Sequence, residues 1–229
     1  MAEDIEKKGN SSELYSKAKD AMDAGTTWSM QLTDGSTLTY KIIGIEHDDL
    51  SDGSGKAGLT FLTTSTNIGT GMNATATNVG GWEKSELRAK MNAGEIWNLM
   101  PSEFQSKVKS VEKLSNNVGG GDENKNAAVT ATSDRLFLLS YSEIVPTSCS
   151  RWASDYPWTS TEGTQYEAFK GKVTNNCGAN PVIAFGDHWW MRSLFPPNSA
   201  LFISVGSLGD PSEADPASGW GCVCLAWCF

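Results

Sequence analysis

The chain of 229 residues contains no cluster of basic residues and no long apolar run. Its 18 Lys and Arg stand against 27 Asp and Glu, which gives a net charge of -9. Binding to phosphate requires clustered Lys and Arg, so we expect no nucleic-acid partner. A helix that crosses a bilayer needs about 20 apolar residues, and the charged residues 1–23 do not resemble a secretory signal. We therefore expect neither a membrane span nor a signal peptide.

Cysteine is also scarce, because a chain of this length has only five: Cys149, Cys177, Cys222, Cys224 and Cys228. That number is too small for a disulfide scaffold, although one bridge between Cys149 and Cys177 stays open. The last three cysteines invite a metal or redox interpretation. A zinc site takes four ligands, however, and both histidines lie far away in sequence. We predict no metal and no cofactor, with Cys224 and Cys228 as small buried side chains.

The chain is instead rich in large aromatic and in small residues. Nine Trp and eight Phe supply apolar area despite a hydrophobic fraction of 39%, so a sizeable core is feasible. Twenty-three Gly, with many Ser, Thr and Asn, favour a loop-rich fold over a helical bundle. The length suits one large domain or two small ones.

Residues 1–25 predict an N-terminal segment that is helical over 3–24 and ends at Gly25. We expect this helix to pack on the remaining domain, residues 26–229. A joint to a larger assembly is the alternative.

Strand patterns follow. Trp28, Met30 and Leu32 alternate with polar residues up to an Asp34-Gly35 turn, and the alternation resumes afterwards, which predicts a β-hairpin. Residues 59–63 predict another strand. The acidic stretch from Asp48 to Asp52 lacks the spacing of a calcium loop and is interpreted as a solvated turn.

Helical and irregular patterns occupy the middle of the chain. Leu87 and Met91 share one face of a short helix over 85–92, and residues 103–108 continue as helix after Pro101. The apolar run 136–140 predicts a central strand. Residues 115–127 predict a flexible polar loop without a phosphate-binding pattern, and 146–188 are irregular and aromatic-rich.

The prediction of function depends mainly on the last segment, residues 189–229. It opens with Trp189-Trp190-Met191-Arg192-Ser193 and continues over 194–220 without a helical or strand period, which predicts loop broken by short strands. Phe202, Ile203 and Val205 would anchor these loops. A disordered tail is the alternative, but an ending in Trp227-Cys228-Phe229 is too apolar to stay solvated. If residues 189–193 are extended, one tryptophan points inward and the other outward, and Arg192 makes a buried ion pair or carbonyl bonds.

Three landmarks carry a family resemblance: Trp82 with Ser85-Glu86-Leu87-Arg88 and Asn92; residues 134–140 with Glu143; and residues 189–193. In this order they resemble a bacterial and phage domain family of unknown function with a C-terminal Trp-Trp-Leu-Arg-Ser-Pro signature. The resemblance covers about residues 28–229, with Leu194 in place of the final Pro. It implies an α+β, C-type-lectin-like fold of the formylglycine-generating-enzyme type, with short helices around small antiparallel sheets.

Some members of that family are variable proteins of diversity-generating retroelements, which rewrite adenines near the end of a gene. The resemblance implies a framework that here comprises Phe202, Val205, Ser207, Gly209 and Gly221. It implies a variable, ligand-binding surface between them at Phe195, Pro197, Asn198, Ala200, Leu201, Ser204, Gly206, Leu208, Asp210, Ser212, Asp215, Ala217, Ser218 and Trp220. All of these except Trp220 can be encoded by an Asn codon altered at its first two bases. Glu213 and Trp220 do not fit such a codon, and Cys222-Val223-Cys224 departs from the usual ending.

Together these features predict a binding protein of the phage tail-tip or bacterial adhesin type. Its partner would be a surface protein or glycan and its location the phage virion or the bacterial surface. A homo-oligomer stays open. Exposed apolar side chains such as Phe195, Leu201, Leu208 and Trp220 would supply the binding energy. An oxidase of the formylglycine-generating type and a structural module without ligand are the alternatives. We predict no catalytic residues, because Asp187-His188 lacks a recognisable nucleophile and fold alone does not carry function.

Overall fold

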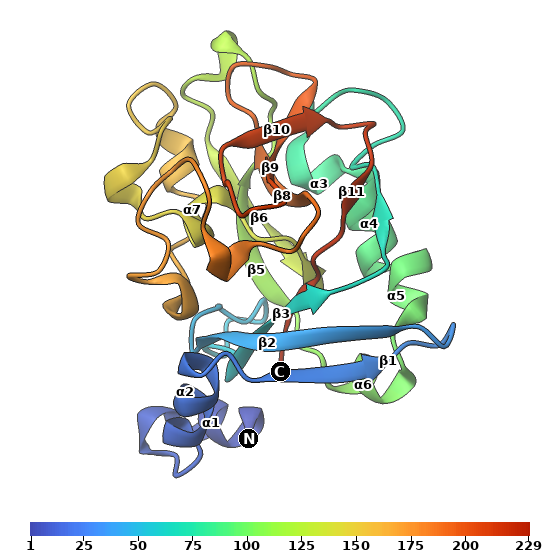
Figure 1. Cartoon of the computed structure of the whole chain (residues 1–229), viewed down its shortest axis with the longest axis vertical. Helices are drawn as coiled ribbons and strands as arrows, with labels where there is room; N and C mark the ends of the chain where they lie inside the picture. Colours follow the sequence, from blue (N-terminus) through green and yellow to red (C-terminus); the bar gives the residue numbers. More distant parts are fainter.

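The computed structural model describes all 229 residues as a mixed α+β fold that is rich in loops (Figure 1). Short helices surround three small sheets, so the predicted fold class is confirmed at this level. No helix is both long enough and apolar enough to cross a membrane.

The first sheet lies in the lower half of Figure 1 and has the strand order β1-β2-β3-β12-β7. The predicted hairpin is confirmed: β1 (Thr27–Gln31) pairs antiparallel with β2 (Thr37–Ile45), and Gly35 in the turn has a φ of 86°. The predicted strand at 59–63 is also confirmed, as β3 (Leu59–Ser65). The chain then returns at its end as β12 (Ala226–Cys228), which lies between β3 and β7 (Leu136–Phe137).

The expectation of a central strand over 136–140 is wrong. Strand β7 covers two residues and forms the edge of its sheet. The next two backbone carbonyls, of Leu138 and Leu139, accept hydrogen bonds from Arg192 instead of continuing a ladder.

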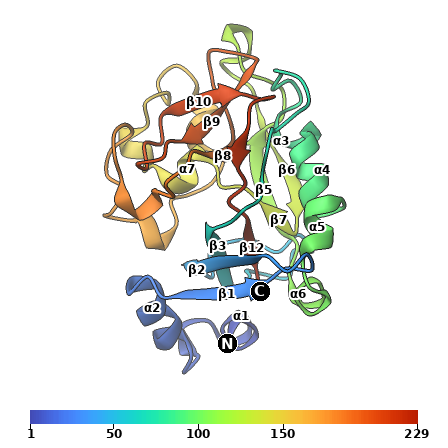
Figure 2. The same ribbon diagram turned by 45° about the vertical axis from the view of Figure 1, so that its right-hand side comes forward.

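The second sheet lies at the opposite end of the molecule and has the order β10-β9-β8-β11-β4. It comprises β4 (Gly69–Thr70), β8 (Trp189–Leu194), β9 (Leu201–Val205), β10 (Glu213–Pro216) and β11 (Gly221–Cys222). Most of the predicted variable region therefore belongs to this sheet and its connecting loops, and the expectation of loop broken by short strands is confirmed. A third sheet, the hairpin of β5 (Val111–Asn116) and β6 (Val129–Asp134), lies beside β8 in Figure 2.

The N-terminal segment contains two helices, α1 (Ala2–Lys8) and α2 (Tyr15–Asp23), so the prediction of one helix over 3–24 is wrong. The break falls at Gly9, whose φ of 56° cannot continue a right-handed helix, and a 3-10 turn follows over Gly9–Ser11. Ile5, Ala18 and Met22 are buried, and α2 contacts β2, which confirms that the segment packs on the rest of the protein.

The remaining helices are short: α3 (Gly81–Lys84), α4 (Glu86–Asn92), α5 (Glu95–Leu99), α6 (Ser102–Lys107) and α7 (Tyr141–Ile144). The predicted helix at 85–92 is confirmed, because Ser85 caps α4 by accepting a hydrogen bond from the Arg88 N–H, and Leu87 and Met91 are buried. Residues 146–188 contain only 3-10 turns between irregular stretches, as expected: Thr147–Cys149, Pro157–Ser160, Glu167–Phe169 and Pro181–Ile183. One further 3-10 turn, Asp122–Asn124, lies in the predicted polar loop.

Candidate binding face and the framework beneath it

Strand β8 forms the floor of the C-terminal region, and all six of its residues are buried. The indole N–H of Trp189 donates to the carbonyl of Ile183, and that of Trp190 donates to the carbonyl of Thr70. Our expectation that one tryptophan would point outward is wrong, because other segments cover both faces of β8. Both indoles are therefore fixed by packing and by a hydrogen bond.

Arg192 ties β8 to the centre of the protein. Its guanidinium donates two bonds to the Glu143 carboxylate, at 2.6 and 2.9 Å, and further bonds to the carbonyls of Leu138 and Glu162, each at 2.7 Å. The predicted buried ion pair with carbonyl bonds is confirmed. Such a planar, fully satisfied fork fixes the position of the strand as well as neutralising the buried charge.

A second buried cation adjoins this pair. The Lys113 ammonium on β5 lies 2.6 Å from both the Asp48 and the Glu143 carboxylates and 3.2 Å from the Tyr166 hydroxyl. Burial alone would raise the pKa of Asp48, but the Lys113 charge and hydrogen bonds from Lys113 and Thr60 hold it well below its usual value. Burial alone would likewise lower the pKa of Lys113, yet the two carboxylates raise it.

The prediction of a solvated acidic turn is therefore wrong for Asp48, although Asp49 and Asp52 are exposed. Sequence reasoning missed this cluster because its charged members come from five separate segments. A lone Lys in a β-strand pattern offers no local sign of burial.

Glu162 is the third carboxylate of the cluster and differs from the other two. It accepts hydrogen bonds from the backbone N–H of Asn116 and from the Ser193 hydroxyl, but no cation contacts its carboxylate directly. Burial raises the pKa of Glu162 to about 7, and hydrogen bonds and the nearby Arg192 offset this rise only in part. The cluster thus contains two cations and three carboxyl groups, one of which changes charge near neutral pH.

The other family landmarks also meet in space. The indole of Trp82 donates to Asp134 at 2.9 Å, and Arg88 forms an ion pair with the same carboxylate at 2.6 Å. The Asn92 side chain donates to the Leu136 carbonyl and accepts from the Arg135 N–H. Landmarks that are far apart in sequence therefore join α3, α4 and β6 into one framework.

The predicted contact residues lie above this framework and divide into three groups. Pro197, Asn198, Leu208, Ser218 and Trp220 are exposed. Phe195, Ala200, Leu201, Asp210, Ser212 and Asp215 are half-buried. Leu208 and Trp220 expose 72% and 54% of their surface, which is unusual for large apolar side chains.

The third group, Ser204, Gly206 and Ala217, is buried, so these three are corrected from surface to framework positions. The Ser204 hydroxyl donates to Asp215. A Cβ on Gly206 would collide with the Glu213 carboxylate. The Ala217 N–H donates to the Ala200 carbonyl, and the Ala217 carbonyl accepts from the Asn73 N–H. Of the expected framework, Phe202, Val205, Gly209 and Gly221 are buried, whereas Ser207 is exposed.

Two buried asparagines hold the loops of the face, and no local sequence pattern marks either of them. The Asn78 side chain donates to the carbonyls of Asn198 and Leu201 and accepts from the Gly120 N–H. The Asn180 side chain donates to the Gly209 carbonyl at 3.0 Å. Next to Asn78, Val79 and Val118 are 64% and 51% exposed and are not among the predicted contact residues.

The chain was compared with known protein families, curated proteins and solved structures. A family model described as a domain of unknown function, DUF6273, matches residues 57–217. The chain belongs to this family. No curated protein and no solved structure matches. The DUF6273 match contains Trp82, Asp134, Glu143 and Arg192, so it includes the whole landmark framework.

In this DUF6273 chain all five cysteines are free thiols, and the open Cys149–Cys177 bridge is not formed. Cys224 and Cys228 are buried, as predicted, and burial raises the pKa of both thiols well above the usual value. Cys177 is exposed. Buried thiols of high pKa are poor nucleophiles, so the C-terminal cysteines are not arranged for thiolate chemistry.

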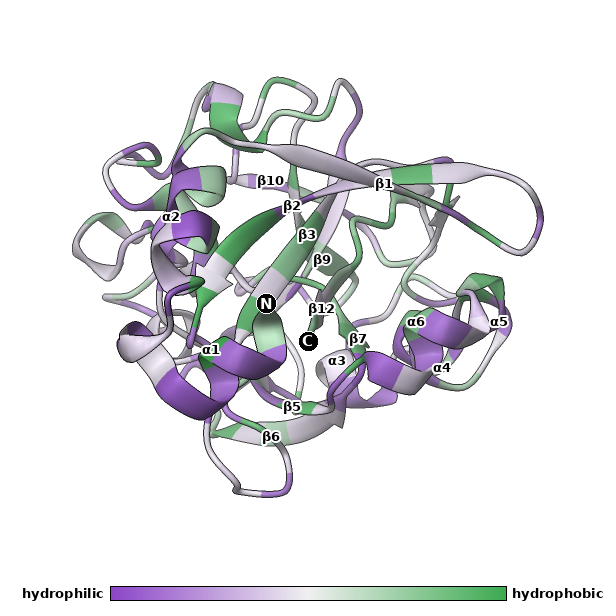
Figure 3. Cartoon of the chain, turned by 90° about the horizontal axis from the view of Figure 1, so that it is seen from below, coloured by the Kyte–Doolittle hydropathy of each residue, from purple (hydrophilic) through white to green (hydrophobic).

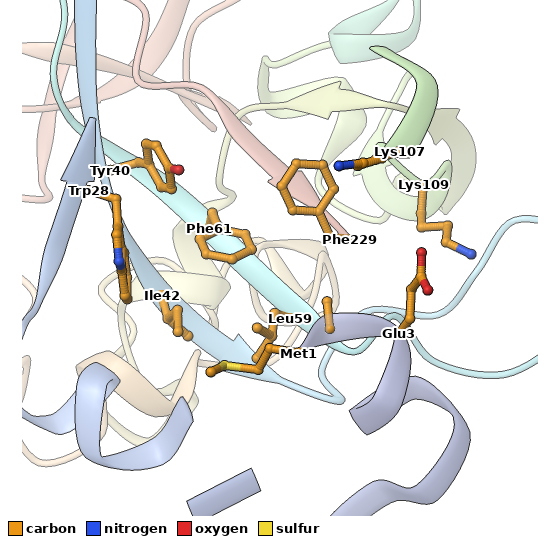
Figure 4. A pocket seen from close by; sticks show the side chains of 11 residues that line it. Met1, Glu3, Trp28, Tyr40, Ile42, Leu59, Phe61, Lys107, Lys109 and Phe229 are labelled. Atoms are coloured by element: carbon orange, nitrogen blue, oxygen red, sulfur yellow. The ribbon is translucent and has the colours of Figure 1, made fainter. Parts of the chain in front are cut away.

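An apolar groove lies at the other end of the molecule, away from the predicted face. Figure 3 shows the strands β1–β3 with α1 on one side and α6 on the other, and Figure 4 shows the rings of Trp28, Tyr40, Phe61 and Phe229 around the groove. Its volume is about 570 Å³, within the range of ligand pockets. None of the predicted contact residues lines it.

Proposed function

We propose that this chain is a C-type-lectin-like display domain that binds a surface protein or a glycan through the loops of residues 195–220. The observation that carries the proposal is the division of one short segment into two sets. Phe202 and Val205 are fully buried, whereas Leu208 and Trp220 of the same segment are largely exposed. A segment built in this way anchors itself and presents a separate set of side chains.

The physical advantage lies in the independence of the two sets. Substitutions of exposed side chains away from special backbone positions usually change stability by less than about 0.5 kcal/mol. The bonds that Arg192 and the two tryptophans of β8 make in the framework below involve none of those side chains. The face can therefore vary while the fold persists.

The lectin assignment itself rests on the sequence resemblance, and the loop-rich arrangement of small sheets supports it. The variable role rests on the codon pattern of residues 195–218. Its direct test is the encoding DNA: a near-copy of the 3′ end that differs at adenines, beside a reverse transcriptase gene, would support it. If the genome that encodes this chain contains no such copy, the variable role is wrong, and the proposal reduces to a binding face of fixed sequence.

Binding is tested with two matched double variants. Leu208→Ala with Trp220→Ala removes the exposed apolar anchors of the proposed face. Trp28→Ala with Leu114→Ala removes an exposed Trp and an exposed Leu elsewhere. Both variants and the parent chain would be applied to a glycan array and to bacterial cells read by flow cytometry.

We expect the first variant to lose binding and the second to keep it. Loss of binding only in the second variant would move the site to Trp28 or Leu114, and the single variant Trp28→Ala would then test the groove of Figure 4, which Trp28 lines and Leu114 does not. Absence of binding by the parent chain to any glycan or cell would favour the structural module. We propose the phage virion or bacterial surface as the location, since a display domain acts there. The oxidase alternative gains no support, because Cys224 and Cys228 are buried.

A further inference from the structure

We propose that Lys113 and Asp48 become joined by a side-chain amide bond, with Glu143 relaying protons. The Lys113 nitrogen lies 2.6 Å from an oxygen of Asp48 and 2.6 Å from an oxygen of Glu143. All three side chains are buried, and the Phe137 ring lies 4.3 Å from the same nitrogen. An amine, a carboxyl group and a second carboxylate are thus in contact inside the protein.

The backbone holds the amine and the carboxyl together. The N–H of Glu112 donates to the Asp49 carbonyl, and that of Ser51 donates to the Ser110 carbonyl, so the segments that carry Asp48 and Lys113 are hydrogen-bonded to each other. Well-oriented intramolecular reactions reach effective concentrations of about 10⁵–10⁸ M. The fixed distance between the Lys113 amine and the Asp48 carboxyl group provides such a high effective concentration.

The surroundings of Asp48 suit attack at its carboxyl carbon. The Thr60 hydroxyl donates to Oδ2 at 2.5 Å, and the Tyr166 hydroxyl lies 2.9 and 3.0 Å from the two oxygens. Donors aimed at a carboxyl oxygen stabilise the negative charge that develops there in a tetrahedral intermediate.

The reaction needs no outside reagent. A proton first passes from the Lys113 ammonium, by way of Glu143 Oε1, to the Asp48 carboxylate. The free amine then attacks the neutral carboxyl carbon, and the new C–N bond forms. The nitrogen gives a second proton through Glu143 to the departing hydroxyl, the C–O bond breaks, and water leaves. One ammonium and one carboxylate thus become one amide and one water.

The removal of buried charge favours the product. The amide removes two charges from the interior and leaves Arg192 and Glu143 as a matched pair. A cleft of about 300 Å³, lined by Asp48, Lys113 and Glu143, gives water a route out.

The test is the intact mass of the purified chain under denaturing, reducing conditions. We expect a mass lower than that of the sequence by one water, and a tryptic digest containing a branched peptide that links Asp48 to Lys113. The sequences Asp34-Gly35 and Asp52-Gly53 can also lose water by forming a succinimide. Mild alkali hydrolyses a succinimide and leaves the amide intact, so alkali treatment before digestion separates the two.

Variants sharpen the result. Lys113→Met should restore the full mass, whereas Lys109→Met, at a lysine outside the cluster, should still lose water. Asp48→Asn should give the same final product as the parent chain, with release of ammonia. Glu143→Gln should slow the reaction. A parent chain of full mass after prolonged incubation in the folded state, or a water loss that maps only to an Asp-Gly site, would overturn the proposal without any variant.

Discussion

The guanidinium of Arg192 and the carboxylate of Glu143 form a two-point ion pair, at 2.6 and 2.9 Å, inside the protein. The pair connects β8 to α7, where Glu143 also accepts from the Ser140 N–H in a capping box. One carboxylate therefore closes a helix N-terminus and anchors the strand below the proposed binding face. This double use makes the pair the central connection of the C-terminal half.

Removing one partner should destabilise the fold strongly. Arg192→Leu leaves the buried Glu143 carboxylate with Lys113 as its only cation, and breaking a buried ion pair typically costs about 3–5 kcal/mol. The free energy of unfolding from urea titration at neutral pH measures this loss. Adding Glu143→Leu should recover part of it, because the carboxylate that lost its two-point partner is then removed. Losses that simply add in the double variant would show that the two residues are not coupled.

Stability should fall as pH rises toward neutrality. The pKa of Glu162 is about 7 in the folded protein, against a usual value of 4.5. Because the folded-state pKa is raised, its contribution is fully present below about pH 4.5 and is lost as pH rises through about 7. Thermal unfolding midpoints across this window should decline in the parent chain. Glu162→Gln should flatten the decline, and an equal slope in both would contradict the assignment.

Substitutions in the C-terminal segment should lower the free energy of unfolding at buried positions and leave it nearly unchanged at exposed ones. Phe202→Ala removes a fully buried ring from β9 and should cost about 3–5 kcal/mol of unfolding free energy. Leu208→Ala, in the exposed loop, should change it by less than about 0.5 kcal/mol. Urea titration of the two variants in parallel tests whether framework and face are independent. A large loss for Leu208→Ala would mean that the loop is part of the core.

Thiol reactivity should follow exposure. Cys177 is exposed and should react first with a maleimide, followed by half-buried Cys149. Cys224 and Cys228 should react only after unfolding, because they are buried and burial raises the pKa of their thiols well above the usual value. Peptide mapping of timed labelling reactions gives the order. Rapid labelling of Cys228 in the folded chain would contradict the burial of β12.

Local patterns predicted a good part of this fold. Alternation on both sides of Asp34-Gly35 gave the first hairpin, and the Leu87 and Met91 spacing gave α4. The apolar residues Phe202, Ile203 and Val205 marked the buried side of the C-terminal segment. Periodicity and turn chemistry are properties of adjacent residues, so a single sequence carries them.

Other features depended on distant segments. Asp48 reads as a solvated turn residue until Lys113, 65 positions later, reaches it. Trp190 reads as half of an alternating strand until Thr70 accepts its indole hydrogen bond, 120 positions away. Burial by β10 and its connecting loops is what distinguishes three residues from their exposed neighbours: Ser204, Gly206 and Ala217.

The sequence by itself determined the landmarks, the anchors and the segment in which binding would be sought. Only the tertiary structure decided which members of that segment reach solvent and which charges meet inside. The physical reason is that burial and charge pairing are set by neighbours in space, and the chain brings those neighbours together only when its separate segments pack.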